Sequence, residues 1–356
     1  MNWGTLCPAL AAALTVLAWE GAADRSTVAA APRPLSLSLS AAAGNPIKDA
    51  IDAWRRDVER RTDGAVTIAI TAERQYEDEE VISAVSSGAV DIGATSLNQF
   101  AFDVPIAGVF LQPFMFNYDA LVRAAARPGG EIRSLVDDEI RYWTTTHVLL
   151  WLPHGSAVMF SRGAPGLDPA AIANRHVGAP DDQTKELTKA CGGTAHLVPP
   201  SDLYDALENN NIQITMADIF SVTERNLWRV TDTIVNTKHS PSLFIVIIND
   251  AVWGNLSADH QRVLTEASEA LQERSFDAVA TIEAQAYAFA ATKGMKVYDP
   301  SPRDVVAWRQ CSAPLLESYV DRIGELGPRL FTAYGRLRTD PCCNDPMAGQ
   351  TPPELR

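Results

Sequence analysis

The feature that most restricts the fold is a stretch of more than thirty residues, from Ser257 to Lys293, without glycine or proline. Ser257 is a favourable N-cap, Asp259 falls in the first turn, and Gly294 follows the last residue. Apolar residues recur at helical spacing, at Val263, Ala267, Leu271, Val279, Ile282, Ala286 and Phe289. At about 1.5 Å per residue a single helix would approach roughly 50 Å, longer than one small lobe. The stretch therefore predicts a helix that supports two lobes; two helices with an unmarked break near Ser275 are the alternative.

Two series of strand and helix patterns occur along the chain. The first alternates strands with helices, at residues 35–40, 50–60, 66–70, 77–87 and 90–94. It begins with the strictly alternating LSLSLS, and its order predicts a mainly parallel sheet covered by helices. The second series lies at residues 147–152, 177–179, 185–191, 204–209 and 243–248. Two sheet-forming series in 356 residues indicate an α/β fold with two lobes rather than one large domain.

The charge of the chain limits its partners. Its formal net charge is -14, from 44 acidic and 30 basic residues. An acidic surface repels nucleic acid and anionic lipid, so neither is expected as a partner. It also gives no long-range attraction to an anionic solute, so any anion site must depend on local donors.

Residues 1–32 resemble a leader segment. An uncharged apolar run from Cys7 to Trp19 is followed by small residues at 21–23 and again at 29–31. The run fits the core of a secretory signal and is too short to span a bilayer. Export is therefore predicted, with the mature chain in the periplasm, although no Lys or Arg precedes the run and an ordinary N-terminal helix is the alternative. No later segment is long and apolar enough for a membrane helix, so the mature chain is not expected to insert in a membrane.

Five cysteines are present, of which Cys7 would leave with the leader. In an oxidising compartment, Cys311 could bridge to Cys342 or Cys343, while Cys191 stands alone. Plain small residues or free thiols are the alternative. No CxxC pair occurs, which gives little support to a zinc or redox site.

Short catalytic motifs are absent from the sequence. GxSxG, GxxxxGK[ST], HExxH and a strand-flanked GxGxxG do not occur, and the six histidines are dispersed. We therefore predict a protein without enzymatic activity, catalytic residues, metal or cofactor.

A series of short motifs, each weak alone, follows the order found in one receptor family. They lie at residues 60–64 (RRTDG), 73–79 (ERQYEDE), 87–92 (SGAVDI), 111–116 (LQPFMF), 199–208 (PPSDLYDALE) and 249–261 (NDAVW, then Leu256, Ser257 and Gln261). Together they resemble the DctP-type extracytoplasmic receptors of tripartite ATP-independent periplasmic (TRAP) transporters, over about residues 41–340.

The resemblance implies two Rossmann-like lobes of periplasmic-binding-protein type, joined by crossover strands and backed by the long helix. A small polar solute is held between the lobes and delivered to TRAP-type membrane permease subunits. The predicted boundaries are 1–32 for the leader, 33–154 plus 243–283 for lobe 1, 155–242 plus 284–340 for lobe 2, and 341–356 for a tail. A sensory receptor domain and a periplasmic enzyme on the same scaffold are the alternatives.

The chain departs from the family where an organic acid is usually held. Gly178, in HVGAP, and Ala157 occupy the positions of two arginines. An arginine binds a carboxylate through two charge-assisted bonds, which neither residue offers. Either the solute is uncharged, cationic or zwitterionic, or another cation supplies the charge, from Arg162, Arg175 or Lys185. The small residues also suggest room for a bulkier solute.

The resemblance supplies a set of candidate ligand-binding positions. They are Asn45, Asp78, Thr95, Ser96, Ala157, Gly178, Thr215, Ala217, Asp218, His239 and Phe244. Asp78 and Asp218 would favour a cationic group in a site that lacks arginine.

Overall fold

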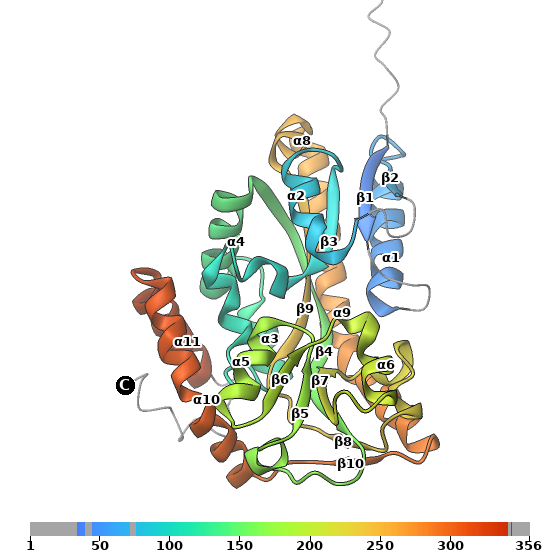
Figure 1. Ribbon diagram of the computed structural model, residues 1–356. Helices are drawn as coiled ribbons and strands as arrows, with labels where there is room; N and C mark the ends of the chain where they lie inside the picture. The colour runs from blue at the N-terminus through green and yellow to red at the C-terminus, as the bar shows by residue number, and fades with distance from the viewer. Residues whose placement is uncertain (1–33, 40–44, 72–75, 341–342, 344–356) are drawn as a thin grey trace, which may run out of the picture. The chain divides into compact units, whose positions relative to one another are not determined.

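The computed structural model describes residues 34–39, 45–71, 76–340 and 343. The predicted leader, Cys342 and most of the predicted tail lie outside these residues. Within them, strands form one ten-stranded sheet in which eight follow the order β2-β1-β3-β9-β4-β7-β5-β6. The chain has the predicted α/β fold of two lobes (Figure 1).

The first strand series forms the sheet of lobe 1. β1 (Leu35–Leu39) lies between β2 (Ile68–Ile70) and β3 (Ile92–Ser96), and both pairings are parallel, as predicted. The connecting helices are α1 (Pro46–Arg61) and, after a short 3-10 turn, α2 (Val81–Ser86). The two faces of this sheet have separate apolar cores, one around Trp54 and the other around Phe110 and Trp151.

The second series forms the sheet of lobe 2. β5 (His176–Ala179) pairs in parallel with β6 (Thr194–Leu197) and with β7 (Ile214–Asp218). Helices α5 (Asp182–Ala190) and α6 (Leu203–Glu208) follow β5 and β6. A further parallel pair, β8 (Thr233–Val235) and β10 (Lys296–Tyr298), joins the sheet through β4.

Two long strands connect the lobes. β4 (Thr146–Ser161) and β9 (Pro241–Asn249) pair antiparallel from Thr146 opposite Asn249 to Ser156 opposite Pro241, with an irregularity between Pro153 and Ser156. Beyond it, β4 pairs with β7. The predicted strand end at residue 152 is wrong because pairing with β9 and then β7 carries β4 onward past Pro153 and Gly155.

The long helix is a single element. α9 (Ala258–Thr292) has 35 residues, and Ser257 Oγ accepts a hydrogen bond from His260 N at its start. Its first half buries Leu264, Ala267 and Leu271 against lobe 1, and its second half buries Ala286 and Ala290 against lobe 2. The predicted helix backing both lobes is confirmed, and the alternative with a break near Ser275 is wrong (Figure 1).

The chain ends in a helix pair that also contacts both lobes. Trp308, in the first half of α10 (Pro302–Ile323), lies in a core of lobe 2, whereas Leu316 and Tyr319 in its second half lie in a core of lobe 1. α11 (Leu326–Thr339) packs in the same lobe 1 core. The remaining α-helices are α3 (Asp119–Ala125), α4 (Glu131–Thr144), α7 (Ser221–Glu224) and α8 (Asp250–Asn255). The lobe boundaries given above stay a prediction.

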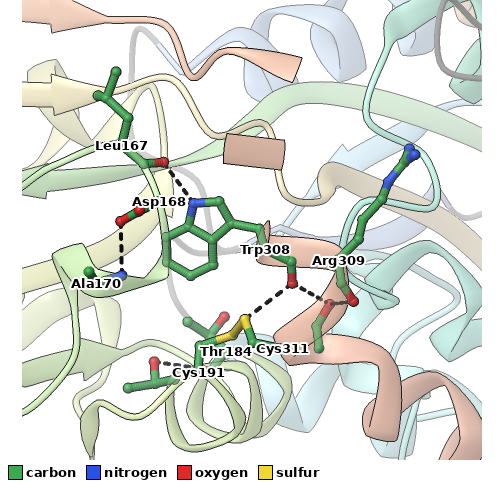
Figure 2. Close-up of a disulfide and its surroundings, with 10 residues drawn as sticks. Leu167, Asp168, Ala170, Thr184, Cys191, Trp308, Arg309 and Cys311 are labelled. Carbon is green, nitrogen blue, oxygen red and sulfur yellow. Dashed lines mark hydrogen bonds between the residues drawn. A yellow bond between two sulfur atoms is a disulfide. The ribbon is translucent and has the colours of Figure 1, made fainter. Parts of the chain in front are cut away.

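A disulfide joins Cys191, directly after α5, to Cys311 on α10. The expectation that Cys311 pairs with Cys342 or Cys343 is therefore wrong. Figure 2 shows the bond beside Trp308, whose Nε1 donates to Leu167 O at 2.9 Å. Residues 120 positions apart are brought together by the packing of α10 on α5.

Among the helices within residues 45–71 and 76–340, none is long and apolar enough to cross a membrane.

Candidate functional site

The carboxyl ends of the parallel strands in lobe 1 carry polar side chains. Asn45 caps α1 after β1, with its Oδ1 accepting from Ile47 N at 2.8 Å. Thr95 and Ser96 end β3, and Asp78 lies beyond β2. This edge is where α/β folds bind ligands.

Asp78 is tied to its own lobe. Its carboxylate accepts hydrogen bonds from Thr95 Oγ1 at 2.8 Å, Ser96 N at 3.2 Å and Gln99 Nε2 at 3.2 Å. Burial raises the pKa of Asp78, and these donors oppose the rise. The side chain therefore fixes the end of β3 to the turn after β2.

The strand ends of lobe 2 are also polar. After β5, Asp181 caps α5 and accepts from Thr184 N at 2.7 Å. At the end of β7, Asp218 Oδ1 accepts from Ser221 N at 3.1 Å, and the short helix α7 then ends at Glu224. This edge is acidic, in contrast to the arginine-bearing edge that the family resemblance implies.

In the described residues, two side-chain hydrogen bonds join the polar strand-end edges of the two lobes. Asn45 Nδ2 donates to Glu224 Oε1 at 2.7 Å, and Asn98 Nδ2 donates to Asp181 Oδ2 at 3.0 Å. Asn45 and Asn98 follow strands of lobe 1, whereas Glu224 and Asp181 follow strands of lobe 2. The two polar edges therefore face each other and are held together.

His154 lies at the irregularity of β4, between the lobes. It is only 4% exposed, and neither ring nitrogen has a hydrogen-bond partner among the residues that the structure describes. Its Nε2 is 3.7 Å from Glu224 Oε1. The rings of Phe220 and Phe244 lie 4.9 and 5.4 Å from the imidazole, between ring centroids.

Charges of both signs act on this histidine. Burial alone would lower the pKa of His154, but the carboxylates of Glu224 and Asp218 outweigh it and raise the pKa above its ordinary value. Burial would raise the pKa of Glu224, but His154 and Arg225 lower it. The imidazolium and carboxylate forms stabilise each other.

Arg225 supplies a cation beside this pair. Its Nε donates to Pro200 O at 2.9 Å, and its Nη1 lies 3.1 Å from Ser221 Oγ and 3.4 Å from Glu224 Oε2. The guanidinium therefore lies beside the carboxylate of Glu224, which accepts from Asn45 of the other lobe.

The positions of the two family arginines are filled differently. A Cβ added to Gly178 would overlap the side chain of Ile212, so the expectation of room for a bulkier solute is wrong there. Ala157 pairs with Asp218 across β4 and β7. Of the other cations considered, Arg162 Nε donates to Val230 O at 2.7 Å beyond the end of β4, and Lys185 pairs with Asp182 on α5. Arg175 precedes β5, at its amino end, whereas the interface lies at its carboxyl end.

The sequence-predicted positions fall into three groups. Asn45, Ala157, Asp218 and Phe244 lie around His154, and Asp78, Thr95 and Ser96 form a hydrogen-bonded group on lobe 1. Ser96 is the register partner of Phe244.

The third group is held by other residues of the fold. Thr215 Oγ1 donates to Gly178 O inside the sheet of lobe 2, and Ala217 lies in its core. His239 is buried, with its Nδ1 2.8 Å from Thr237 Oγ1 and its ring beside Phe114.

Sequence reasoning missed His154, Glu224 and Arg225. The local signal for His154 was a histidine flanked by Pro153 and Gly155, which together break an apolar run. Glu224 and Arg225 follow β7 as the family's other pocket segments follow their strands, but nothing nearby distinguishes them from a solvated helix end.

Two small cavities are found, the second of them lined by Pro153, Gly155 and Ser156 beside His154. One of about 30 Å³ is enclosed by Gln112 to Met115 and by α10 and α11, and one of about 20 Å³ lies between the crossover strands and α9. In the described part of the chain, no three His, Cys, Asp or Glu side chains are placed to hold a metal ion.

Comparison with curated proteins gives distant relatives. The chain is 24% identical over 325 residues to the uncharacterized protein y4mM of Sinorhizobium fredii, covering 90% of this chain but only 58% of that protein. It is 23% identical over 271 residues to the C4-dicarboxylate-binding periplasmic protein DctP of Rhodobacter capsulatus, covering 75% and 80% of the two chains. It is 19% identical over 294 residues to the sialic acid-binding periplasmic protein SiaP of Vibrio cholerae, covering 82% and 89%.

Solved structures share the fold. An extracytoplasmic solute receptor of Bordetella pertussis that binds pyroglutamic acid matches with a TM-score of 0.78 at 15% identity, covering 85% of this chain and 99% of that one. A TRAP periplasmic solute-binding protein from Desulfovibrio desulfuricans, with bound sn-glycerol-3-phosphate, matches with a TM-score of 0.79 at 16% identity, covering 86% and 98%.

The family assignment covers most of the described chain. Residues 37–322 match the family described as bacterial extracellular solute-binding protein, family 7, or DctP. The match spans the strand ends of both lobes, the crossover strands and the long helix. The chain belongs to the DctP family of bacterial extracellular solute-binding proteins.

Proposed function

We propose that this chain captures a small polar solute between its lobes in the periplasm and delivers it, chemically unchanged, to a TRAP-type membrane permease. One observation carries the proposal: the polar strand ends of the two lobes face each other across the buried His154, tied by Asn45–Glu224 and Asn98–Asp181. A ligand that binds to both lobes stabilises the closed arrangement, in which such contacts between the lobes form.

The relatives support delivery rather than chemistry. Two relatives are named for binding C4-dicarboxylates and sialic acid, and solved structural neighbours bind pyroglutamic acid, glucuronate and sn-glycerol-3-phosphate. The proposed contacts here are Asn45, His154, Asp218, Glu224 and Arg225. Phe220 and Phe244 form apolar walls.

A thermal-shift screen tests capture. A solute at a hundredfold excess over its Kd stabilises the folded chain by about 2.7 kcal/mol, enough to raise the melting temperature measurably. The panel contains organic acids, sugar acids, sugar phosphates, amines, zwitterions and polyols. We expect one class to stabilise the protein and to be recovered intact by mass spectrometry. A panel without any stabilising solute, or recovery of an altered solute, contradicts the proposal.

Uptake tests delivery. Cells that lack the gene for this protein should lose uptake of the radiolabelled stabilising solute and recover it when the wild-type gene is restored. Undiminished uptake in the deleted cells would contradict a role in transport.

A further inference from the structure

We propose that the solute is a zwitterion with an N–H-bearing ammonium and a carboxylate, with Glu224 and Asp218 facing the ammonium and His154 and Arg225 facing the carboxylate. The inference rests on the proposed function and adds the charge class of the solute.

Both signs of charge are gathered at one place between the lobes. His154 Nε2 lies 3.7 Å from Glu224 Oε1, and Arg225 Nη1 lies 3.4 Å from Glu224 Oε2. Asp218 is the last residue of β7 and pairs with Ala157 of β4, which lies three residues after His154. Two carboxylates, an imidazole and a guanidinium therefore lie together where the strand ends of the two lobes meet.

In the described residues, the buried imidazole has a charged neighbour in Glu224 but no hydrogen bond. A buried polar group without a hydrogen bond is destabilising, and such groups in native proteins usually have a role. His154 is 4% exposed, and its two nitrogens have no hydrogen-bond partner in the described residues. The carboxylates of Glu224 and Asp218 raise its pKa against the effect of burial, which favours a ring that donates. A solute carboxylate is the complementary acceptor.

Glu224 accepts from a neutral donor that a solute can replace. Its Oε1 is bonded to the amide of Asn45 at 2.7 Å. A hydrogen bond from an ammonium to a carboxylate is stronger than one from a neutral amide. An ammonium at this point would therefore be favoured, and the Asn45 amide would be free to bind the same solute.

Solutes of a single charge fit less well. A simple anion meets two carboxylates and finds Gly178 and Ala157 at the arginine positions. A simple amine meets the guanidinium of Arg225 and offers no acceptor to the ring of His154. A zwitterion gives each charge an opposite partner and leaves the net charge of the site unchanged.

Isothermal titration with matched solutes tests the charge class. Each of the twenty amino acids is compared with its 2-hydroxy acid, which lacks the ammonium, and with its decarboxylated amine. We expect the tightest binder to be an amino acid, at least tenfold tighter than both of its counterparts. A 2-hydroxy acid, an amine or another organic acid as the tightest binder overturns the inference and leaves the proposed function intact. If no solute binds, here or in the wider panel, the proposed function fails and the inference with it.

Glu224→Gln separates the ammonium contact from closure. The glutamine oxygen can still accept from Asn45, so the loss of charge is the main change. We expect the affinity for the amino acid to fall at least tenfold, while that for its 2-hydroxy acid stays equal or rises.

Asp181→Asn is the matched control, since Asp181 also accepts from an asparagine across the lobes. Asparagine retains the cap on α5, and the ratio of the two affinities should stay at the wild-type value. The inference would be overturned if Glu224→Gln lost affinity equally for the amino acid and its 2-hydroxy acid. It would also be overturned if Asp181→Asn changed the ratio of these two affinities as much as Glu224→Gln does. The apo melting temperature of each variant checks folding, and the wild-type comparison stands independently of the variants.

Discussion

His239 shows what burial does to a single titratable side chain. Its ring is 4% exposed, and burial lowers its pKa to about 4. Unfolding returns the imidazole to water, where its pKa is about 6.5. The unfolded chain therefore takes up this proton first as the pH falls, and the stability contributed by the neutral ring is lost between about pH 6.5 and pH 4.

The contribution of His239 to the free energy of unfolding should therefore decrease in acid, and a variant can isolate it. Between pH 7 and pH 5, His239 should lower the free energy of unfolding by about 2 kcal/mol, at about 1.4 kcal/mol per pH unit below 6.5. Urea unfolding of wild type and His239→Gln at both pH values measures the difference between their losses. Equal losses in the two proteins would show that His239 does not titrate as proposed.

His154 has the opposite sign. Its pKa is raised in the folded chain, so its contribution is complete below the unfolded pKa and is lost as the pH rises through the folded value. Two buried histidines in one chain therefore respond oppositely to pH, because the carboxylates of Glu224 and Asp218 act on His154 whereas burial alone shifts His239.

At the scale of elements, the buried Gln272 fixes α9 to two other elements of lobe 1. Gln272 Oε1 accepts from Trp151 N on β4 and from Arg133 Nη1 on α4, each at 3.0 Å. Its Nε2 donates to Ala126 O at 2.9 Å. One amide thus joins the helix, a crossover strand and the helix that covers lobe 1.

Replacing this amide should destabilise the fold. Gln272→Leu leaves the buried Trp151 N–H without its acceptor, so we expect a loss of about 2–4 kcal/mol in the free energy of unfolding. Arg274→Ala, at an exposed position of the same helix, is the control and should change stability by less than about 0.5 kcal/mol. Chemical denaturation measures both. Similar values for the two variants would contradict the role assigned to Gln272.

For the whole molecule, the Cys191–Cys311 bond links lobe 2 to a helix whose other half packs on lobe 1. A disulfide closing a loop of this length stabilises a fold typically by about 2–4 kcal/mol, chiefly by restricting the unfolded chain.

We therefore expect the double variant Cys191→Ala/Cys311→Ala to unfold at lower temperature and lower denaturant concentration than wild type. A reductant should lower the stability of wild type toward that of the variant and leave the variant unchanged. A variant as stable as oxidised wild type would contradict this expectation.

Local patterns predicted the elements that are defined by local chemistry. Ser257 and Gly294 mark the two ends of α9, and the alternation at LSLSL marks β1. β4 was predicted too short because proline and glycine resemble a strand end, whereas the pairing that carries the strand onward comes from residues far away in sequence.

The candidate site was harder to predict from the sequence, because its residues are also far apart along the chain. His154 and Glu224 are seventy positions apart and meet only through the lobe arrangement. The partner of Cys311 depended on how α10 packs on α5. The resemblance did supply Asn45, Asp218 and Phe244, because those positions follow strands or lie on crossovers in the shared fold.

The shared strands have a consequence for how the chain acquires its fold. A chain emerges from the ribosome amino end first, yet β3 of lobe 1 waits for β9, where Ile92 pairs with Ile248, until the first segment of lobe 2, which lies between β4 and β9, has been made. Lobe 1 is consequently not an independent unit of synthesis. Until β9 arrives, the nascent polypeptide presents an unpaired, apolar strand edge, the kind of surface on which holding chaperones act and misassembly begins.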